Sequence, residues 1–534
     1  MTPDLANICT SGLPYAGRFW DVPEIGVEAA WHFGKLHKKY GPIFEWKVMG
    51  ITHIWIETDK VARDLFVLRQ RKYCDRNELP AAIGVKQDCE ILPLSGFSDD
   101  LKRHKNFIHA IMRESNPKSF YGWPMIENKR TLARLIHSPE RWSEHMITHC
   151  ARTIASIAWG DPVHGNKLLI VVPDLLKAVS PAGPLINKLT FLQNLPAWMS
   201  PWKKAEAQRK KLMTDAFYEA LEDVKDRMEK GTAEECWTML WLNANKAVDN
   251  LKLDYHEAAY AIGSSSFVAI ATIGGPLHAF FLACAHYPEW LPKLQEEIDT
   301  VCGDRLPVAE DLPSLPRLRA TVKEIMRWRQ STPLGVPHEV LEDDVYDGYF
   351  IPKGAMCHAN HFLISREEDK FPQGEKFIPE RWLDPKYPSY KEPLTEYPNL
   401  RGDTAFGYGS RSCPGVDLTF FELCTLFGAL AFSFDIKPKE GVPLPWYDVN
   451  PYVITMGQHF PIDIVPRSEE KKRFILDGCP GGDAGYTLKT KADNRWDILH
   501  DEKEGKPWTW EGLTLKYQAP ETPRVWPDGG HWRV

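Results

Sequence analysis

The stretch Phe406-Gly-Tyr-Gly409-Ser-Arg411-Ser-Cys413-Pro-Gly415 stands directly before an apolar helical pattern at 416–432. A cysteine at a helix N-terminus lies close to amide dipoles that lower its pKa and favour the metal-binding thiolate. Gly409 and Gly415 remove side chains where the backbone must approach a large flat cofactor, and Arg411 supplies a cation for an acidic group. A lone cysteine is more often simply buried, but the spacing of Phe406, the glycines and Arg411 favours a metal ligand at Cys413.

This run resembles the haem-binding signature of the cytochrome P-450 superfamily, Phe-x-x-Gly-x-Arg-x-Cys-x-Gly, with every specified position filled. The resemblance implies that Cys413 is the axial ligand of the haem iron. It also implies that Phe406, Gly409, Arg411 and Gly415 help to hold haem b. A thiolate ligand donates electron density to the iron and favours O–O cleavage.

Two further segments follow the family order ahead of the cysteine run. Glu324 and Arg327 lie one helical turn apart and so share a helix face, and Arg381 stands in Pro379-Glu-Arg-Trp382. A Glu–Arg pair at this spacing is by itself typical of a solvated surface. The family has such a helix followed by a Pro-Glu-Arg segment. The resemblance therefore implies that Glu324, Arg327 and Arg381 form a structural triad and not a catalytic one.

The resemblance covers residues 13–466 and looks most like fungal secondary-metabolism members. It implies a mainly α catalytic domain with a smaller β-rich region drawn from both ends of that domain. Local patterns predict strands at 43–48 and 53–56, a helix at 60–71, helices over 101–301 interrupted at 196–201, strands over 335–356 and a long loop at 384–409. Residues 467–534 are interpreted as a C-terminal extension of unknown role, with Trp496, Trp508, Trp510, Trp526 and Trp532 in a polar background.

One departure from the family lies on an early helix. Where the family has Trp-x-x-x-Arg to hold a haem propionate, this chain has Leu101-Lys-Arg-His-Lys105. Lys105 can supply a cation, though not the bidentate fork of an arginine. By resemblance His338, in the Pro-His element before the second group of strands, is a further propionate contact. His104 is interpreted as an exposed helix residue.

The second departure lies in the central helix. Counting back from Tyr287-Pro-Glu289, which resembles the family's His-Pro-Glu, the oxygen-activation motif falls on Val268-Ala-Ile-Ala271-Thr272-Ile273. The threonine is kept, and Ala271 replaces the acid. Thr272 could instead only cap a kink by bonding to a preceding carbonyl, but its register favours a role in catalysis. By family analogy the substrate pocket is faced by Phe267, Ile270, Ala271, Leu334 and Val336, which predicts a hydrophobic substrate.

Composition limits the classes of partner and compartment. The chain has 534 residues, of which 43% are apolar, and its formal charge of −7 argues against nucleic acid as a partner. The eleven cysteines include no CxxC pair, which fits a reducing compartment. As written, the chain starts without a signal peptide or an anchor, and the uncharged run 258–285 is interpreted as a buried core helix and not as a membrane span. We therefore expect an intracellular protein, cytosolic or peripheral on the endoplasmic reticulum surface.

The resemblance implies a haem-dependent monooxygenase of secondary-metabolite biosynthesis that oxidises a hydrophobic small molecule with dioxygen. Its electrons would come from NADPH through a separate NADPH-cytochrome P-450 reductase, since no Gly-rich dinucleotide fingerprint follows a strand. Two alternatives remain open. Ala271 suggests a haem-thiolate enzyme that catalyses oxidative coupling, rearrangement or dehydration without net oxygen insertion, and the last alternative is a non-catalytic haem sensor.

Overall fold

The structure is a computed structural model, and it describes residues 15–18, 21, 26–115, 122–180, 184–187, 189–244, 252–446, 454, 457 and 459–479. The α-helices in this part of the chain are α1 Gly26–Tyr40, α2 Asp59–Arg63, α3 Asp99–Ser115, α4 Gly122–His137, α5 Trp142–Trp159, α6 His164–Val179, α7 Pro201–Glu229, α8 Trp237–Ala244, α9 Tyr255–His286, α10 Trp290–Cys302, α11 Pro316–Trp328, α12 His361–Ile364, α13 Val416–Ser433 and α14 Glu469–Leu476. The strands are β1 Ile43–Val48, β2 Ile51–Ile56, β3 His338–Glu339, β4 Asp344–Tyr346, β5 Tyr349–Ile351, β6 Met356–Ala359, β7 Phe434–Pro438 and β8 Ile462–Pro466.

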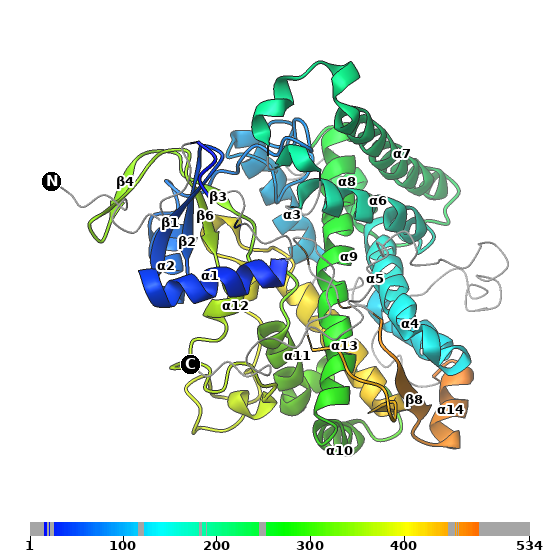
Figure 1. The fold of residues 1–534 in the computed structure, drawn as a ribbon. Coiled ribbons are helices and arrows are strands. Elements are labelled where there is room, and N and C mark those ends of the chain that lie inside the picture. The colour runs from blue at the N-terminus through cyan, green and yellow to red at the C-terminus, as the bar shows by residue number, and fades with distance from the viewer. Residues whose placement is uncertain are drawn as a thin grey trace.

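The largest sheet joins two strands near the N-terminus with two strands from the segment 338–359. Its order is β1-β2-β6-β3, and β2 pairs in parallel with β6 so that Trp55 lies opposite His358. The antiparallel pairs β4–β5 and β7–β8 are separate two-stranded sheets. In Figure 1 the four-stranded sheet lies beside the helical body and next to α1. This arrangement confirms the predicted mainly α fold with a small β-rich region from distant segments.

Helix α9 runs through the helical body, as Figure 1 shows. It begins with a capping box in which Asp254 accepts from the Glu257 amide and Glu257 accepts from the Asp254 amide. Most of its side chains are buried, because α3, α5, α6, α7 and α11 pack around it. By length and composition α9 and α13 could each cross a membrane, but 78% of each apolar window is buried in protein, as in soluble core helices.

The remaining local predictions agree with the structure. The helix at 60–71 is α2 followed by a π-helical turn at Asp64–Leu68. The interruption at 196–201 holds the short 3-10 turn Ala197–Met199, and α7 begins at Pro201. Within 384–409 the regular structure is limited to the short 3-10 turn Thr404–Phe406 and the start of another at Gly409. This long loop leads directly to the cysteine run.

The first part of the C-terminal extension packs on the helical body. Arg467 donates from both terminal nitrogens to Asp299 of α10, at 2.9 and 2.6 Å. Helix α14 follows and buries Ile475. Residues 467–479 are therefore structurally part of the body, and the five tryptophans of the extension lie outside the described residues.

Candidate active site

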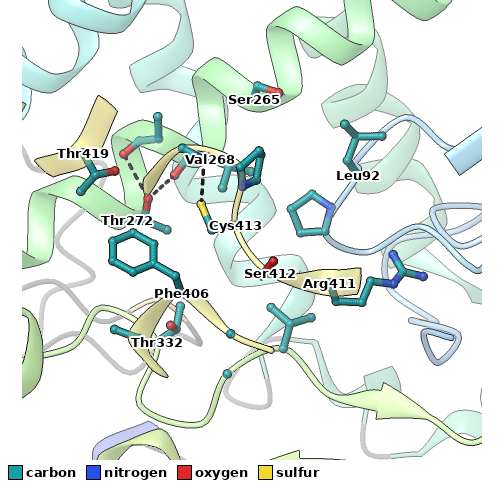
Figure 2. A pocket seen from close by; sticks show the side chains of 18 of the residues that line it. Leu92, Ser265, Val268, Thr272, Thr332, Phe406, Arg411, Ser412, Cys413 and Thr419 are labelled. Carbon is teal, nitrogen blue, oxygen red and sulfur yellow. Dashed lines mark hydrogen bonds between the residues drawn. The ribbon is translucent and has the colours of Figure 1, made fainter. Parts of the chain in front are cut away.

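A cavity of about 270 Å³ lies between α9 and the cysteine run. The residues that line it come from α3, α9, the segment after α11 and the run from Ala405 to Gly415. Figure 2 shows Thr272, Phe406 and Cys413 around this cavity. Segments more than 300 residues apart in the sequence thus meet at one site.

Cys413 lies just ahead of helix α13, two residues before the N-cap residue of that helix, Gly415. Its amide donates to the Phe406 carbonyl at 2.8 Å, and the Gly415 amide donates to the Cys413 sulfur at 3.3 Å. Burial raises the pKa of the Cys413 thiol above its ordinary value, and the Gly415 amide and Lys105 oppose this shift. The amide effect expected from the sequence is thus present at Gly415, and in the absence of a metal ion burial outweighs it. A bound cation would have to supply the rest of the stabilisation that a thiolate needs.

Gly409 and Gly415, two glycines of the cysteine run, have different surroundings. Gly409 has a φ of +56°, and a Cβ there would lie 2.1 Å from the Phe66 carbonyl oxygen. This close approach of two backbones requires glycine. Gly409 does not line the cavity, whereas Gly415 does, with space for a Cβ at 3.8 Å from the Cys413 sulfur. The expectation that Gly409 clears space for the cofactor is thus corrected: it clears space for Phe66.

A group of basic side chains gathers on one wall of the cavity: Arg76, Lys105 and Arg411. Arg411 donates from Nε to the Cys74 carbonyl at 2.7 Å, while its buried Nη2 has no hydrogen-bond partner. Lys105 donates to the Ser410 carbonyl. Burial, and then the charges of Arg411 and Arg76, lower the pKa of Lys105 to about 8. The charges of Arg411 and Arg76 therefore disfavour the protonated form of Lys105, while Asp75 offsets part of the repulsion at Arg76 and Arg411.

Arg76 was missed by the sequence analysis. It is buried and donates to the carbonyls of Pro93 and Pro337, at 2.8 and 2.9 Å. No motif marks this residue, because its place depends on the pairing of Asp75 with Glu339, which lies far along the chain.

The neighbouring histidines are both buried. His338 lines the cavity, stacks on Phe66 with ring centroids 4.1 Å apart, and its Nδ1 lies 2.6 Å from the Tyr73 carbonyl. A carbonyl only accepts, so Nδ1 carries a proton there and Nε2 faces elsewhere. Burial, and then the charge of Arg76, hold the pKa of His338 well below its ordinary value. His338 can therefore donate from Nε2 to an anion only if the negative charge of that anion raises this pKa enough for Nε2 to be protonated. His104, expected to be exposed, is buried where α3 packs on α9, with Nε2 3.4 Å from Glu257.

These residues fit a flat cofactor with acidic groups. Among the residues that the structure describes, no aspartate or glutamate lines the cavity. Three cations and an unpartnered guanidinium nitrogen on one wall suit carboxylates, and the cysteine sulfur on the same cavity suits a soft metal ion. The residues present are thus the ones that a haem would need.

Glu324 of α11 is the centre of a buried ion cluster. It accepts from Arg327 at 2.7 and 2.9 Å and from Arg381 at 3.0 Å. The Ile378 amide and the Trp382 indole also donate to it, at 2.9 and 3.0 Å. All three charged side chains are buried, which excludes the solvated surface pair. The structure brings Glu324, Arg327 and Arg381 together as the sequence predicts.

Helix α9 turns one face to the cavity. The lining residues of this face are Ser264, Ser265, Val268, Ala269, Thr272 and Ile273. Thr272 donates its hydroxyl proton to the Val268 carbonyl at 3.1 Å, with the Ala269 carbonyl at 3.4 Å (Figure 2). Both interpretations of Thr272 therefore hold in geometry: it bonds to a preceding carbonyl and it faces the cavity.

Most of the predicted substrate-facing residues do not line this cavity. Phe267, Ile270 and Ala271 belong to the main hydrophobic core, because successive residues of a helix are about 100° apart and these three point away from the lining face. Leu334 packs against the aromatic cluster of the first sheet. Val336 does line the cavity. The pocket-facing set is thus corrected to the face that carries Val268 and Thr272.

Comparison with known proteins agrees with this geometry. A family model described as Cytochrome P450 matches residues 11–458. The chain belongs to the cytochrome P450 family.

Curated relatives of this P450 come from fungi. It is 30% identical over 451 residues to the cytochrome P450 monooxygenase psoD of Aspergillus fumigatus, covering 82% of each chain. It is also 30% identical to the monooxygenase claR of Ampulloclitocybe clavipes over 486 residues, covering 87% of each chain. A solved zebra fish cytochrome P450 superposes with a TM-score of 0.66 at 18% identity, covering 82% of this chain and all of that one, and so supports the fold.

Family membership confirms the predicted enzyme class and cofactor. The protein is a cytochrome P450 monooxygenase that binds haem b and takes electrons from a redox partner. The monooxygenase virE of Hypocrea virens, 26% identical over 476 residues, is a further relative of the same enzyme class.

Proposed function

We propose that this P450 oxidises a hydrophobic small molecule in secondary-metabolite biosynthesis, with dioxygen and with electrons passed from NADPH by a separate NADPH-cytochrome P450 reductase. The observation that supports this proposal is the joint placement of the Cys413 sulfur, the Thr272 hydroxyl and three cations around one cavity. A cysteine without this setting would be an inert core residue.

In this proposal Cys413 is the axial thiolate. Haem bound by such a ligand supplies the oxidising chemistry, since the anionic sulfur donates electron density to the iron. Arg76, Lys105 and Arg411 would pair with the two propionates, and His338 would add a further contact if protonated. Phe406 and Gly415 border the same space. Glu324, Arg327 and Arg381 would act at a distance by fixing the segments ahead of the cysteine run.

The substrate end of the cavity is mostly apolar. Its walls include Leu92, Ile108, Met112, Val268 and Val336. Such walls favour apolar ligands through burial of their surface, while a few hydroxyls set orientation. We therefore infer a substrate that is hydrophobic over most of its surface.

The test is the absorption band of the reduced carbon monoxide complex, which reports a thiolate ligand. Cys413→Ser should lose this band, because a neutral hydroxyl replaces the soft anionic ligand. Cys424→Ala is the matched control, since Cys424 is a buried cysteine on α13 that does not line the cavity. Retention of the band in Cys413→Ser would refute the assignment of the ligand.

A second function has a specific observation in its favour. The acid of the oxygen-activation motif is replaced by Ala271, and no described carboxylate lines the cavity. General acid assistance to oxygen cleavage contributes about 10² to 10⁴ in rate, so an enzyme that performs a redox-neutral rearrangement or dehydration would lose little by this change. Mass analysis of the product made under ¹⁸O₂ separates the two functions, since only oxygen insertion adds the label. A haem sensor would consume neither NADPH nor dioxygen.

We further infer peripheral contact with an intracellular membrane. Trp198 and Met199 are exposed together just before α7. An exposed tryptophan beside an apolar side chain suits a membrane interface. Release of the protein by a carbonate wash agrees with peripheral contact, and retention in the pellet contradicts it.

A further inference from the structure

Helix α9 contains a proline one turn after Thr272. Pro276 is buried inside the helix and is preceded by Gly274 and Gly275. In an α-helix the amide of residue 276 would donate to the carbonyl of residue 272, but proline has no amide proton and its ring crowds that carbonyl. The carbonyl of Thr272 therefore lacks its ordinary helical donor. A buried carbonyl without a donor is costly.

A side chain from another segment supplies a donor at this point. The Ser331 hydroxyl donates to the Thr272 carbonyl. Ser331 is buried, lies three residues beyond the end of α11 and lines the same cavity as Thr272. The segment that follows it, through Val336 to His338, forms another part of the cavity wall. One hydrogen bond thus joins the bend of α9 to a neighbouring wall of the active site.

We propose that Ser331 is a positioning residue, whose hydroxyl replaces the amide proton that Pro276 cannot supply and so fixes the part of α9 that carries Thr272. The consequence for catalysis rests on the proposed function, since it assumes that the Thr272 hydroxyl takes part in proton delivery. With Ala271 in place of an acid, Thr272 is the residue of this motif that has a hydroxyl, and its orientation depends on this one turn of helix. A small rotation of the turn would move the hydroxyl away from the cavity.

The positioning role can be tested without any substrate, by amide hydrogen exchange of the haem-loaded enzyme. Ser331→Ala should lower the protection of peptides covering 268–278 by about tenfold, because the Thr272 carbonyl loses its donor. Ser331→Thr keeps a hydroxyl and should restore the protection. Ser266→Ala is the matched control: the Ser266 hydroxyl is also buried on α9, but it donates at 2.9 Å to the Ile262 carbonyl, which has its own helical donor at residue 266.

The decisive variant is Pro276→Ala, which returns an amide proton to position 276. In that background Ser331→Ala should change the protection by less than about threefold, because the Thr272 carbonyl again has a helical donor. Equal losses in the two backgrounds would overturn the proposal, as would an unchanged protection in Ser331→Ala alone. If Ser331→Ala does not fold with haem, recovery of a folded haem protein in the double variant supports the proposal, and failure of both variants overturns it.

A second measurement, made with a purified reductase, tests whether the position of α9 affects the reaction. It is the amount of hydrogen peroxide released per NADPH oxidised. Ser331→Ala should raise this ratio, as is also expected for Thr272→Ala, and adding Pro276→Ala to Ser331→Ala should return the ratio toward the wild-type value. If the exchange results follow the expectation while peroxide release does not change, Ser331 positions α9 and the role of Thr272 in the proposed function is wrong.

Discussion

Removal of the Glu324 carboxylate should be among the most damaging single changes outside the cavity. Glu324→Ala leaves Arg327 and Arg381 buried beside each other without a counter-charge, with exposed fractions of 2% and 0%. Arg327 keeps bonds to the carbonyls of Ser365, Gly374 and Lys376, but these do not neutralise its charge. Removing one partner of a buried pair costs about 3 to 5 kcal/mol, a factor of about 10² to 10⁴ in the ratio of folded to unfolded protein.

The assay is urea unfolding followed by haem absorbance, with the yield of haem-loaded protein as a second readout. Glu380→Ala is the control, since Glu380 lies in the same segment as Arg381 but is 39% exposed on its side chain and pairs at the surface with Lys293, at 2.9 Å. An exposed pair of this kind contributes at most about 1 kcal/mol. Equal losses of stability and haem content in the two variants would refute the reasoning.

The same cluster gives a pH dependence with a defined sign. Burial alone would raise the pKa of Glu324, but Arg327 and Arg381 hold it below its ordinary value of 4.5. A group whose pKa is lower in the folded state stabilises the fold at pH values above its unfolded pKa. Its contribution is lost as the pH falls through the lowered value. Below about pH 5, the free energy of unfolding of Glu324→Gln should therefore fall less steeply with decreasing pH than that of the wild type.

Three further outcomes are expected. Haem retention after gel filtration should fall in the wild type at high pH once Lys105 loses its proton, whereas Lys105→Arg, whose guanidinium stays charged, should hold haem to higher pH; identical profiles would remove Lys105 from the site. Ile475→Ala should lower the free energy of unfolding in urea by about 2 to 5 kcal/mol, because Ile475 is only 2% exposed. Leu476→Ala should lower it by less than about 1 kcal/mol, because Leu476 is 47% exposed. Equal losses would contradict the packing of α14. Thr272→Ala should raise peroxide release per NADPH, and unchanged coupling would exclude Thr272 from proton delivery.

The parts of the site that follow from local sequence could be predicted residue by residue. Cys413 and Phe406 lie in one short run, and Glu324 and Arg327 lie one turn apart, so their spacing alone indicates their joint placement. Arg76 could not be predicted in this way, since its place on the cavity wall depends on long-range contacts, among them the bridge between Asp75 and Glu339 and its own bond to the Pro337 carbonyl.

The sequence predicts correctly that Thr272 of α9 faces the cavity, but it predicts the wrong neighbours on that face. The distance along the chain from Tyr287 identifies the position of Thr272 in the motif, but it does not show in which direction the neighbouring side chains point. Residues one and two positions before Thr272 lie about 100° and 200° around the helix from it, so Ala271 and Ile270 turn to the core. The residues at four and eight positions before it, Val268 and Ser264, return to the cavity.

The hydrogen bonds of Thr272 restrict how it can assist proton delivery. A hydroxyl has one proton to donate and two lone pairs that accept, and this proton is given to the Val268 carbonyl. In this geometry Thr272 presents lone pairs to the cavity, so it can orient a water by accepting from it but does not itself supply a proton. Ser331 has likewise given its proton to the Thr272 carbonyl. If the proposed oxygen chemistry takes place, its protons would have to arrive through water, because no described carboxylate lines the cavity, and the lone pairs of Thr272 would help to hold that water.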